Sequence, residues 1–315
     1  MQPLAGTLVV DFTWYLPGPF ASRELLRLGA RVVRVEPPEG DPLRTAVPLW
    51  HDALNGGKES VVCDLKADVA FANALCARAD AVLDGFRPGV FERLGVEVPE
   101  TAVLCSITGF GVGNRHAARA GHDLTYLGWA GALADTAPAL PPIQPADLAA
   151  GGLSAALDVV AALLERERTG RGARLVVSMT HGSHRLVAHR VGGAPERVLT
   201  GGLACYRLYA TADGRWLAVG ALEPKFFRRL CEVVGKPELG ERQFEPDQER
   251  LASELAEAIA RRTLAEWLEL TDAEDVAVGP VWTLAEASAE FGLEVAGRPP
   301  ELGEHTEAWR AALQA

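Results

Sequence analysis

The chain has 315 residues, of which 48% are hydrophobic and 23% charged, so it has the composition of a globular protein large enough for two domains. Its formal net charge of −11 argues against nucleic acid or an anionic membrane as a partner, so a polyanionic ligand needs a local cluster of Arg and Lys. Five cysteines without a CxxC pair favour reduced thiols over disulfides or zinc, and no leader or membrane-spanning stretch is expected, which predicts a cytoplasmic protein.

The first half of the chain alternates between predicted strands and helices. Apolar runs rich in β-branched residues predict strands at 8–12, 30–36, 60–65, 81–83, 102–107 and 174–179. Helices are expected at 21–28, 67–78, 89–94 and 148–168. Strand, helix and strand at this spacing form βαβ units, so the sequence predicts an α/β fold with a doubly wound, Rossmann-like parallel sheet. Ligands of such sheets bind beyond the carboxyl ends of the strands.

The second half of the chain changes character. Periodicity is lost over 191–203, which we interpret as a linker. Beyond it, 206–210 and 216–220 flank the turn Asp213-Gly214 and predict a β-hairpin, followed by helices at 224–235 and 251–262 and a strand at 276–281. We therefore expect a large domain over 1–190, joined by a C-terminal segment over 296–315 with a terminal helix, and a smaller α+β domain over 204–295.

The stretch from Gly121 to Tyr126 places an imidazole and a carboxylate, His122 and Asp123, at the mouth of a predicted helix. Free backbone N–H groups and the positive end of the helix dipole favour a developing anion there. A histidine exchanges protons near neutral pH. The simpler interpretation is a helix cap in which His122 is hydrogen-bonded to Asp123. A further carboxylate, Asp147, begins the next helix, where it either joins His122 in a site or stabilises the helix N-terminus.

Two other patterns invite a ligand. Gly109, Gly111 and Gly113 lack the later glycine and the acidic residue of a dinucleotide-binding fingerprint, so we interpret them as a turn. His181, His184 and His189 have no acidic or thiol ligand close by in the sequence. They are interpreted as a solvated helix face, and no metal is predicted.

Several separated motifs, in order over nearly the whole chain, resemble the family III CoA transferases (CaiB/BaiF-like proteins), which include the α-methylacyl-CoA racemases. The resemblance is carried by residues 16–19, 28–38, 40–44, 86–95, 107–111, 212–215, 279–281 and 302–306. It implies an interlocked homodimer in which each chain threads through its partner. It also implies active sites between the large domain of one chain and the small domain of the other.

Within that family, residues 121–127 and 220–227 look like the racemase form. The transferases use an Asp nucleophile at the position of Asp147 and carry a tetraglycine loop in the small domain, which this sequence lacks. The resemblance therefore implies that His122 and Asp147 are the two acid/base residues, that Glu223 supports His122, and that Asp123 sits beside them. Two other functions stay open: a CoA transferase with an acyl anhydride on Asp147, and a non-catalytic CoA-binding paralogue.

The racemase chemistry explains these residue types. Inverting the carbon next to a thioester removes a weakly acidic proton from one face and returns one to the other, so two titratable groups must flank the carbon and an enolate oxygen must be stabilised. Free His and Asp have pKa values near ~6.5 and ~3.9, so burial and neighbours must bring their basicities together. Glu223, hydrogen-bonded to the imidazole, would raise its basicity.

By the same resemblance, CoA recognition falls to a set of residues spread over the large domain. Arg34 is expected against the adenine, and the others are Asn55, Gly56, Gly57, Lys58, Arg87, Gly121, Leu124, Thr125 and Tyr126. CoA is part of the substrate, so no separate cofactor is predicted. Val176 stands where the family commonly has Asp, and the segment 55–58 lacks the customary Arg, which affects the expected acyl pocket and CoA affinity.

Overall fold

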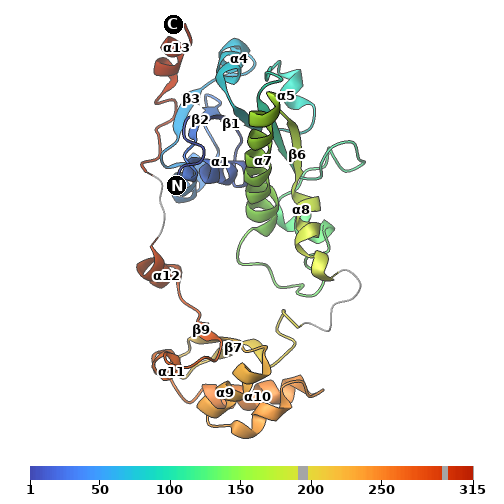
Figure 1. Cartoon of the computed structure of the whole chain (residues 1–315), viewed down its shortest axis with the longest axis vertical. Helices are drawn as coiled ribbons and strands as arrows, with labels where there is room; N and C mark the ends of the chain where they lie inside the picture. The colour runs from blue at the N-terminus through green and yellow to red at the C-terminus, as the bar shows by residue number, and fades with distance from the viewer. Residues whose placement is uncertain (191–197, 293–296, 315) are drawn as a thin grey trace. The chain divides into compact units, whose positions relative to one another are not determined.

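The computed structural model describes residues 1–190, 198–292 and 297–314, and Figure 1 shows the course of the chain. It divides into two compact units, Met1–Ala188 with Glu294–Ala315, and His189–Leu293. The expected bounds were 1–190 with 296–315 and 204–295. Part of the linker expected over 191–203 lies outside the described residues.

The large unit is organised around a six-stranded parallel sheet. Its strands are β1 (Leu8–Phe12), β2 (Arg31–Glu36), β3 (Glu59–Val62), β4 (Ala81–Asp84), β5 (Val103–Thr108) and β6 (Arg174–Ser178). Their spatial order is β3-β2-β1-β4-β5-β6, and Val10 of β1 pairs with Val33 of β2 and Val82 of β4. The predicted doubly wound α/β fold is confirmed. The strand order reverses between β1 and β4, which is where such sheets bind ligands.

Helices cover both faces of this sheet because successive strand residues point to opposite sides. Val9 packs in a core with Leu25 and Val159, whereas its neighbour Val10 packs with Leu75 and Trp309. The first face carries α1 (Pro17–Arg27), η1 (Ala146–Leu153) and α7 (Ser154–Thr169). The second carries α4 (Val69–Arg78), α5 (Val90–Arg93) and α13 (Thr306–Gln314). In Figure 1, α1 and α7 lie together against the sheet.

Four further elements of the large unit complete the surroundings of the sheet. They are α2 (Leu43–Ala46), α3 (Pro48–Asn55), α6 (Asp123–Trp129) and α8 (Met179–Leu186), and the short turn η2 (Ala188–Arg190) follows. The sequence did not predict α2 and α3. The predicted helix over 21–28 begins earlier, at Pro17, because proline is tolerated in the first turn of a helix.

The helical stretch formed by η1 and α7 corrects one expectation. Ala146–Thr169 is 24 residues long and apolar enough to cross a membrane by length and composition, whereas no such stretch was predicted. Half of its most apolar window is buried inside the protein, where the helix packs on the sheet with Val159 and Leu163. The core helix of a globular protein has the same composition, so this finding is weak support for a membrane span.

The small unit contains the predicted hairpin. β7 (Tyr206–Ala210) and β8 (Trp216–Gly220) pair antiparallel, and β9 (Val278–Pro280) adds to β8. The helices are α9 (Pro224–Val233), α10 (Gln248–Ile259), α11 (Leu264–Thr271) and α12 (Leu284–Phe291), with the short η3 (Pro237–Arg242). Leu217, Phe227 and Trp267 meet in its core. All five cysteines of the chain are buried free thiols, as expected.

Candidate active site

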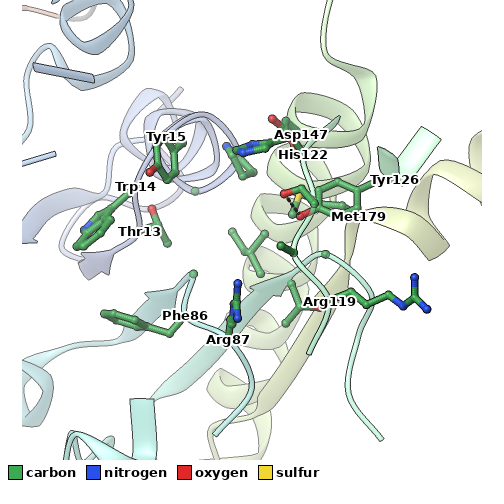
Figure 2. A pocket seen from close by; sticks show the side chains of 18 of the residues that line it. Thr13, Trp14, Tyr15, Phe86, Arg87, Arg119, His122, Tyr126, Asp147 and Met179 are labelled. Atoms are coloured by element: carbon green, nitrogen blue, oxygen red, sulfur yellow. Dashed lines mark hydrogen bonds between the residues drawn. The ribbon is translucent and has the colours of Figure 1, made fainter. Parts of the chain in front are cut away.

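A cavity of about 370 Å³ lies at the point where the strand order reverses. Its walls come from the segments that follow the carboxyl ends of β1, β4 and β5, together with the starts of α6 and η1. His122 and Asp147 both line it (Figure 2). The structure therefore brings together the two residues predicted to carry protons, at the position that the sheet topology favours for a ligand.

The start of α6 is fixed by contacts with its own preceding loop. His122 is the N-cap residue of α6, with an extended backbone, and the Thr125 hydroxyl bonds to the His122 N–H at 3.0 Å and to its carbonyl at 2.8 Å. The Tyr126 hydroxyl donates to the Gly121 carbonyl at 2.6 Å. A Cβ on Gly121 or Gly109 would lie 2.5 or 2.6 Å from the Tyr126 ring, so both positions require glycine. These contacts set the position from which the His122 imidazole reaches the cavity.

Asp123 joins the start of α6, where His122 lies, to the start of η1, where Asp147 lies. Its carboxylate accepts hydrogen bonds from the backbone N–H groups of Ala146 at 2.7 Å and Asp147 at 3.0 Å. Burial raises the pKa of Asp123, and these two hydrogen bonds oppose the shift. His122 therefore occupies the cap position that the helix-cap interpretation gave it. The Asp123 carboxylate bonds to the first turn of η1 and not to His122. Asp123 therefore links the segment that holds His122 to the segment that holds Asp147.

Asp147 sits in the first turn of η1, a π-helical segment of the kind often found at functional sites. Close packing holds this segment in place, because a Cβ on Gly152 would lie 2.9 Å from the Pro17 carbonyl and one on Gly151 would lie 3.0 Å from Met179. Asp147 is 9% exposed. Burial, and then the charge of Asp123, raise the pKa of Asp147 to about 7. This carboxyl group can therefore hold or release a proton near neutral pH.

His122 lines the same cavity and is solvent-exposed. The Tyr15 ring lies beside it, with 6.3 Å between ring centroids and an interplanar angle of 87°. An imidazole and a carboxyl group that line one cavity are side chains of the types that can add and remove protons at a bound substrate.

The cations predicted to bind CoA fall into two groups. Arg34 and Lys58 are 0% and 3% exposed, inside the protein. Arg34 pairs with Asp41 at 2.8 Å, and the Lys58 ammonium lies 2.9 Å from Asn55 Oδ1. Both cations are thus committed to internal partners, and neither is presented to the cavity. Their contact with the coenzyme stays a prediction.

Arg87 differs, because it is exposed and lines the cavity, and Figure 2 shows its guanidinium directed toward the space between the walls. Arg119 also lines the cavity, with its guanidinium 5.3 Å from the centre of the Trp129 ring. A second cavity of about 310 Å³ shares Trp14 and Phe86 with the first and contains Lys66 in its wall. Arg87 and Arg119 therefore bring positive charge to the first cavity, whereas Lys66 shares the wall of the second with Glu39 and Asp64.

The remaining predicted residues lie as follows. Gly121 and Tyr126 line the cavity, Leu124 and Thr125 are exposed on α6, and Gly56 and Gly57 follow α3, where the Gly57 N–H donates to the Arg298 carbonyl at 2.9 Å. Glu223 is the exposed N-cap residue of α9 in the small unit, and its support of His122 stays a prediction.

Metal-ligand chemistry has no obvious place in the described ranges. Among residues 1–190, 198–292 and 297–314, no group of three or more His, Cys, Asp and Glu side chains is arranged to hold an ion. His181 contacts the Ser178 hydroxyl at 2.8 Å, and His184 contacts the Ala130 carbonyl at 3.0 Å.

Sequence analysis missed the segment between β1 and α1. Thr13, Trp14 and Tyr15 line the cavity directly after the carboxyl end of β1. The signal was present, because the first βα turn of a doubly wound sheet is a common ligand position.

A parallel sheet with an imidazole and a carboxyl group in the cavity at its strand-order reversal is an arrangement typical of an enzyme. Residues 4–306 match CoA-transferase family III, and the chain belongs to this family. Over 307 residues it is 35% identical to the human α-methylacyl-CoA racemase, covering 90% of this chain and 78% of that protein. It is also 32% identical over 322 residues to the acetyl-CoA:oxalate CoA-transferase of Acetobacter aceti, covering 91% and 82%. A solved CaiB/BaiF family structure from Brucella suis covers 99% of both chains with a TM-score of 0.84 and 27% identity. The family acts on acyl-CoA and contains racemases and CoA transferases.

Proposed function

We propose that the protein is a racemase or epimerase that inverts the α-carbon of a 2-methylacyl-CoA thioester by two-base proton transfer through an enolate. His122 and Asp147 are the two proton carriers. One observation carries this proposal: the two side chains line one cavity, and the Asp147 carboxyl has a pKa of about 7. A carboxyl group with this raised pKa can be protonated or ionised near neutral pH, as a group that is the acid in one direction and the base in the other must be.

In one direction, neutral His122 removes the α-proton and its electron pair moves into the thioester carbonyl to give an enolate. Protonated Asp147 then delivers its proton to the opposite face of the carbon. In the other direction, ionised Asp147 is the base and protonated His122 is the acid. Backbone N–H groups at the start of α6 are expected to stabilise the enolate oxygen. Asp123 keeps the carriers in register through its bonds to Ala146 and Asp147.

CoA belongs to the substrate in this proposal, and Arg87 contributes charge to its binding. The adjoining cavity with Lys66 offers room for the part of the coenzyme beyond the thioester, because Trp14 and Phe86 line both spaces.

The active form in this proposal is a cytoplasmic, interlocked homodimer in which Glu223 supports His122. An apolar stripe on α7 supports association, since Leu157 and Leu164 are 69% and 63% exposed. Light scattering should find dimers that dissociate only on unfolding. A folded monomer at low micromolar concentration would contradict this part of the proposal.

The Acetobacter relative favours a second candidate, a CoA transferase. In that reaction ionised Asp147 attacks the thioester carbonyl, the carbon–sulfur bond breaks, and CoA leaves as the thiolate while an acyl anhydride forms on Asp147. The CoA thiolate next attacks the Asp147 carbonyl of the anhydride, which releases the first acid and leaves a CoA thioester on Asp147. A second carboxylate attacks this thioester and CoA leaves again, and the thiolate then attacks the acyl carbonyl of the new anhydride, which gives the new acyl-CoA and frees Asp147. CoA thus moves to a second carboxylic acid, and no α-proton moves.

Solvent exchange separates the two functions. A single enantiomer of a 2-methylacyl-CoA, incubated in heavy water without any free acid, should gain α-deuterium and lose optical purity. His122→Gln should abolish inversion and retain exchange from the one enantiomer whose proton faces Asp147. Asp158→Asn and His181→Gln, which alter side chains outside the cavity, should behave like the parent. Incorporation of labelled carboxylic acids into the thioester pool without α-exchange would make the racemase proposal wrong.

A further inference from the structure

A chain of buried polar groups begins at Lys58 and leads toward the cavity. The Lys58 ammonium lies 2.7 Å from the Ser22 hydroxyl, 2.7 Å from the Pro19 carbonyl and 2.9 Å from Asn55 Oδ1. Ser22 lies 2.5 Å from a carboxylate oxygen of Asp11. Ser22 and Asp11 are both 0% exposed. A buried carboxylate and a buried ammonium joined through one hydroxyl form a stiff connection, because each group would be costly to leave unpartnered.

The other end of this chain is Thr13, in the wall of the cavity. The second carboxylate oxygen of Asp11 accepts from the Thr13 N–H at 2.8 Å and from its hydroxyl at 2.5 Å. Arg34 donates to the Thr13 carbonyl at 3.3 Å, and a Cβ on Gly18 would lie 2.0 Å from the Thr13 hydroxyl. Thr13 is thus held through its backbone and its side chain, and the turn that follows it starts from a fixed point.

That turn contains an unusual backbone conformation. Tyr15 has a φ of +64°, in the left-handed region that a bulky residue avoids. The conformation is not explained by burial of the side chain, because Tyr15 is 46% exposed. Strain of this kind persists only where the surroundings impose it, and it gathers at functional sites. The strained backbone places the Tyr15 ring edge-to-face with the His122 imidazole, at 6.3 Å between centroids.

We infer that Tyr15 is a positioning residue for His122. The polar chain from Lys58 through Ser22 and Asp11 to Thr13 keeps the turn in the left-handed conformation, and the Tyr15 ring restricts the imidazole to the orientation that faces the α-carbon. This inference rests on the proposed function of His122 as a proton carrier. In this inference the buried Lys58 acts indirectly, because it helps to hold the turn that carries Tyr15.

Two substitutions at Tyr15 test the inference. Glycine adopts a φ of +64° without strain, so Tyr15→Gly should fold at least as well as the parent while losing the ring. α-Exchange should fall roughly 10- to 100-fold for the enantiomer that depends on His122, since misplacing a reacting group by about 1 Å has effects of this size. Exchange of the other enantiomer through Asp147 should change less than about 3-fold. Tyr15→Phe keeps the ring and should behave like the parent. Equal loss for both enantiomers, or full activity of Tyr15→Gly, would overturn the inference.

A second experiment, NMR of the histidine ring protons, does not depend on catalytic turnover. The ring proton signals of His122, assigned with His122→Gln, should move in Tyr15→Gly and stay in place in Tyr15→Phe, with those of His305 unchanged in both. Ser22→Ala, which interrupts the polar chain, should move the His122 signals in the same direction as Tyr15→Gly. If the parent shows no α-exchange, the proposed function is wrong. The His122 signals then still test whether the Tyr15 ring positions the His122 imidazole. Signals of His122 that ignore Tyr15→Gly would overturn the inference whatever the parent catalyses.

Discussion

Two groups of charged residues lie at the carboxyl ends of the same sheet and differ in how their charges are paired. At the end of β2, Glu36 and Arg44 form an ion pair at 2.7 Å beside buried Arg34. Burial alone would raise the pKa of Glu36, but hydrogen bonds from Arg44 and the charge of Arg34 lower it to about 2. At the start of η1, Asp147 is buried beside a second carboxylate, and its pKa is raised to about 7. A buried carboxylate with cationic partners stays ionised and stabilises the fold through its ion pairs. A buried carboxylate beside another carboxylate can instead exchange a proton near neutral pH.

The difference explains which predicted residues reach the cavity. Arg87 and His122 are exposed and line the cavity, whereas Arg34 and Lys58 are enclosed by partners of their own.

The largest expected effect comes from removing the carboxyl group that lacks a cation. Asp147→Asn keeps the shape of the side chain and cannot carry the proton. Racemisation should fall roughly 10²- to 10⁴-fold, the usual contribution of a general acid or base. Optical rotation of a 2-methylacyl-CoA measures the loss, with Asp158→Asn as the matched control. An Asp147→Asn variant within about 3-fold of the parent would show that this carboxyl group is not a proton carrier.

The enclosed cation should instead affect stability. Arg34→Met leaves Asp41 and Glu36 buried with fewer partners, and the loss of one member of a buried pair costs about 3–5 kcal/mol. Urea unfolding should show this decrease in the free energy of unfolding. The control is Arg228→Met, whose exposed pair with Glu241 should contribute less than about 1 kcal/mol. If Arg34→Met and Arg228→Met both lowered the free energy of unfolding by less than about 1 kcal/mol, the buried ion pairs at the end of β2 would not be the stabilising group that we describe.

Asp147 should also leave a pH signature in stability. Its folded-state pKa of about 7 lies above the ordinary value near ~3.9, so the folded protein binds more protons than the unfolded chain between these values. Stability contributed by the protonated group is present below about pH 4 and is lost as the pH rises toward 7. By linkage the difference is on the order of 2–4 kcal/mol. Unfolding free energies measured from pH 4 to 8 should fall more steeply for the parent than for Asp147→Asn, and parallel curves would contradict the raised pKa.

Arg87 should give the smallest effect. It is exposed, so Arg87→Ala should leave stability unchanged and weaken CoA binding about 10-fold, or about 1.4 kcal/mol, with less effect on a truncated thioester. Calorimetry with CoA measures this, and Arg93→Ala on α5 is the exposed control. Equal affinity of the Arg87→Ala variant and the parent would remove Arg87 from the binding site.

Much of the fold was predictable because the order and spacing of the apolar runs are enough to predict a parallel sheet. Four of the five residues of Leu8–Phe12 are apolar and they lie on both faces of the strand, which fits a sheet covered by helices on both sides. The hairpin at 206–220 was predicted from its Asp213-Gly214 turn. The positions of His122 and Asp147 at helix starts were also predictable, because both residues precede apolar helical segments.

Other features depend on contacts that no local pattern reveals. The bond from Asp123 to the Ala146 N–H joins residues 23 positions apart. Lys58 is enclosed because α3 and α1 meet around it, and α3 has only a weak helical pattern in the sequence. The left-handed backbone of Tyr15 is imposed from Asp11 and Thr13, and a tyrosine at that position gives no hint of it.

The central claim is that Asp147 exchanges its proton near neutral pH beside His122. Carbon-13 NMR of the protein labelled at the aspartate carboxyl groups tests it directly, with the Asp147 signal assigned from Asp147→Asn. The account predicts that this signal titrates with a pKa of about 7, and that it titrates at lower pH in Asp123→Asn, which removes the neighbouring charge. An Asp147 carboxyl group that titrates near ~4 in the parent, like a free aspartate, would contradict the account.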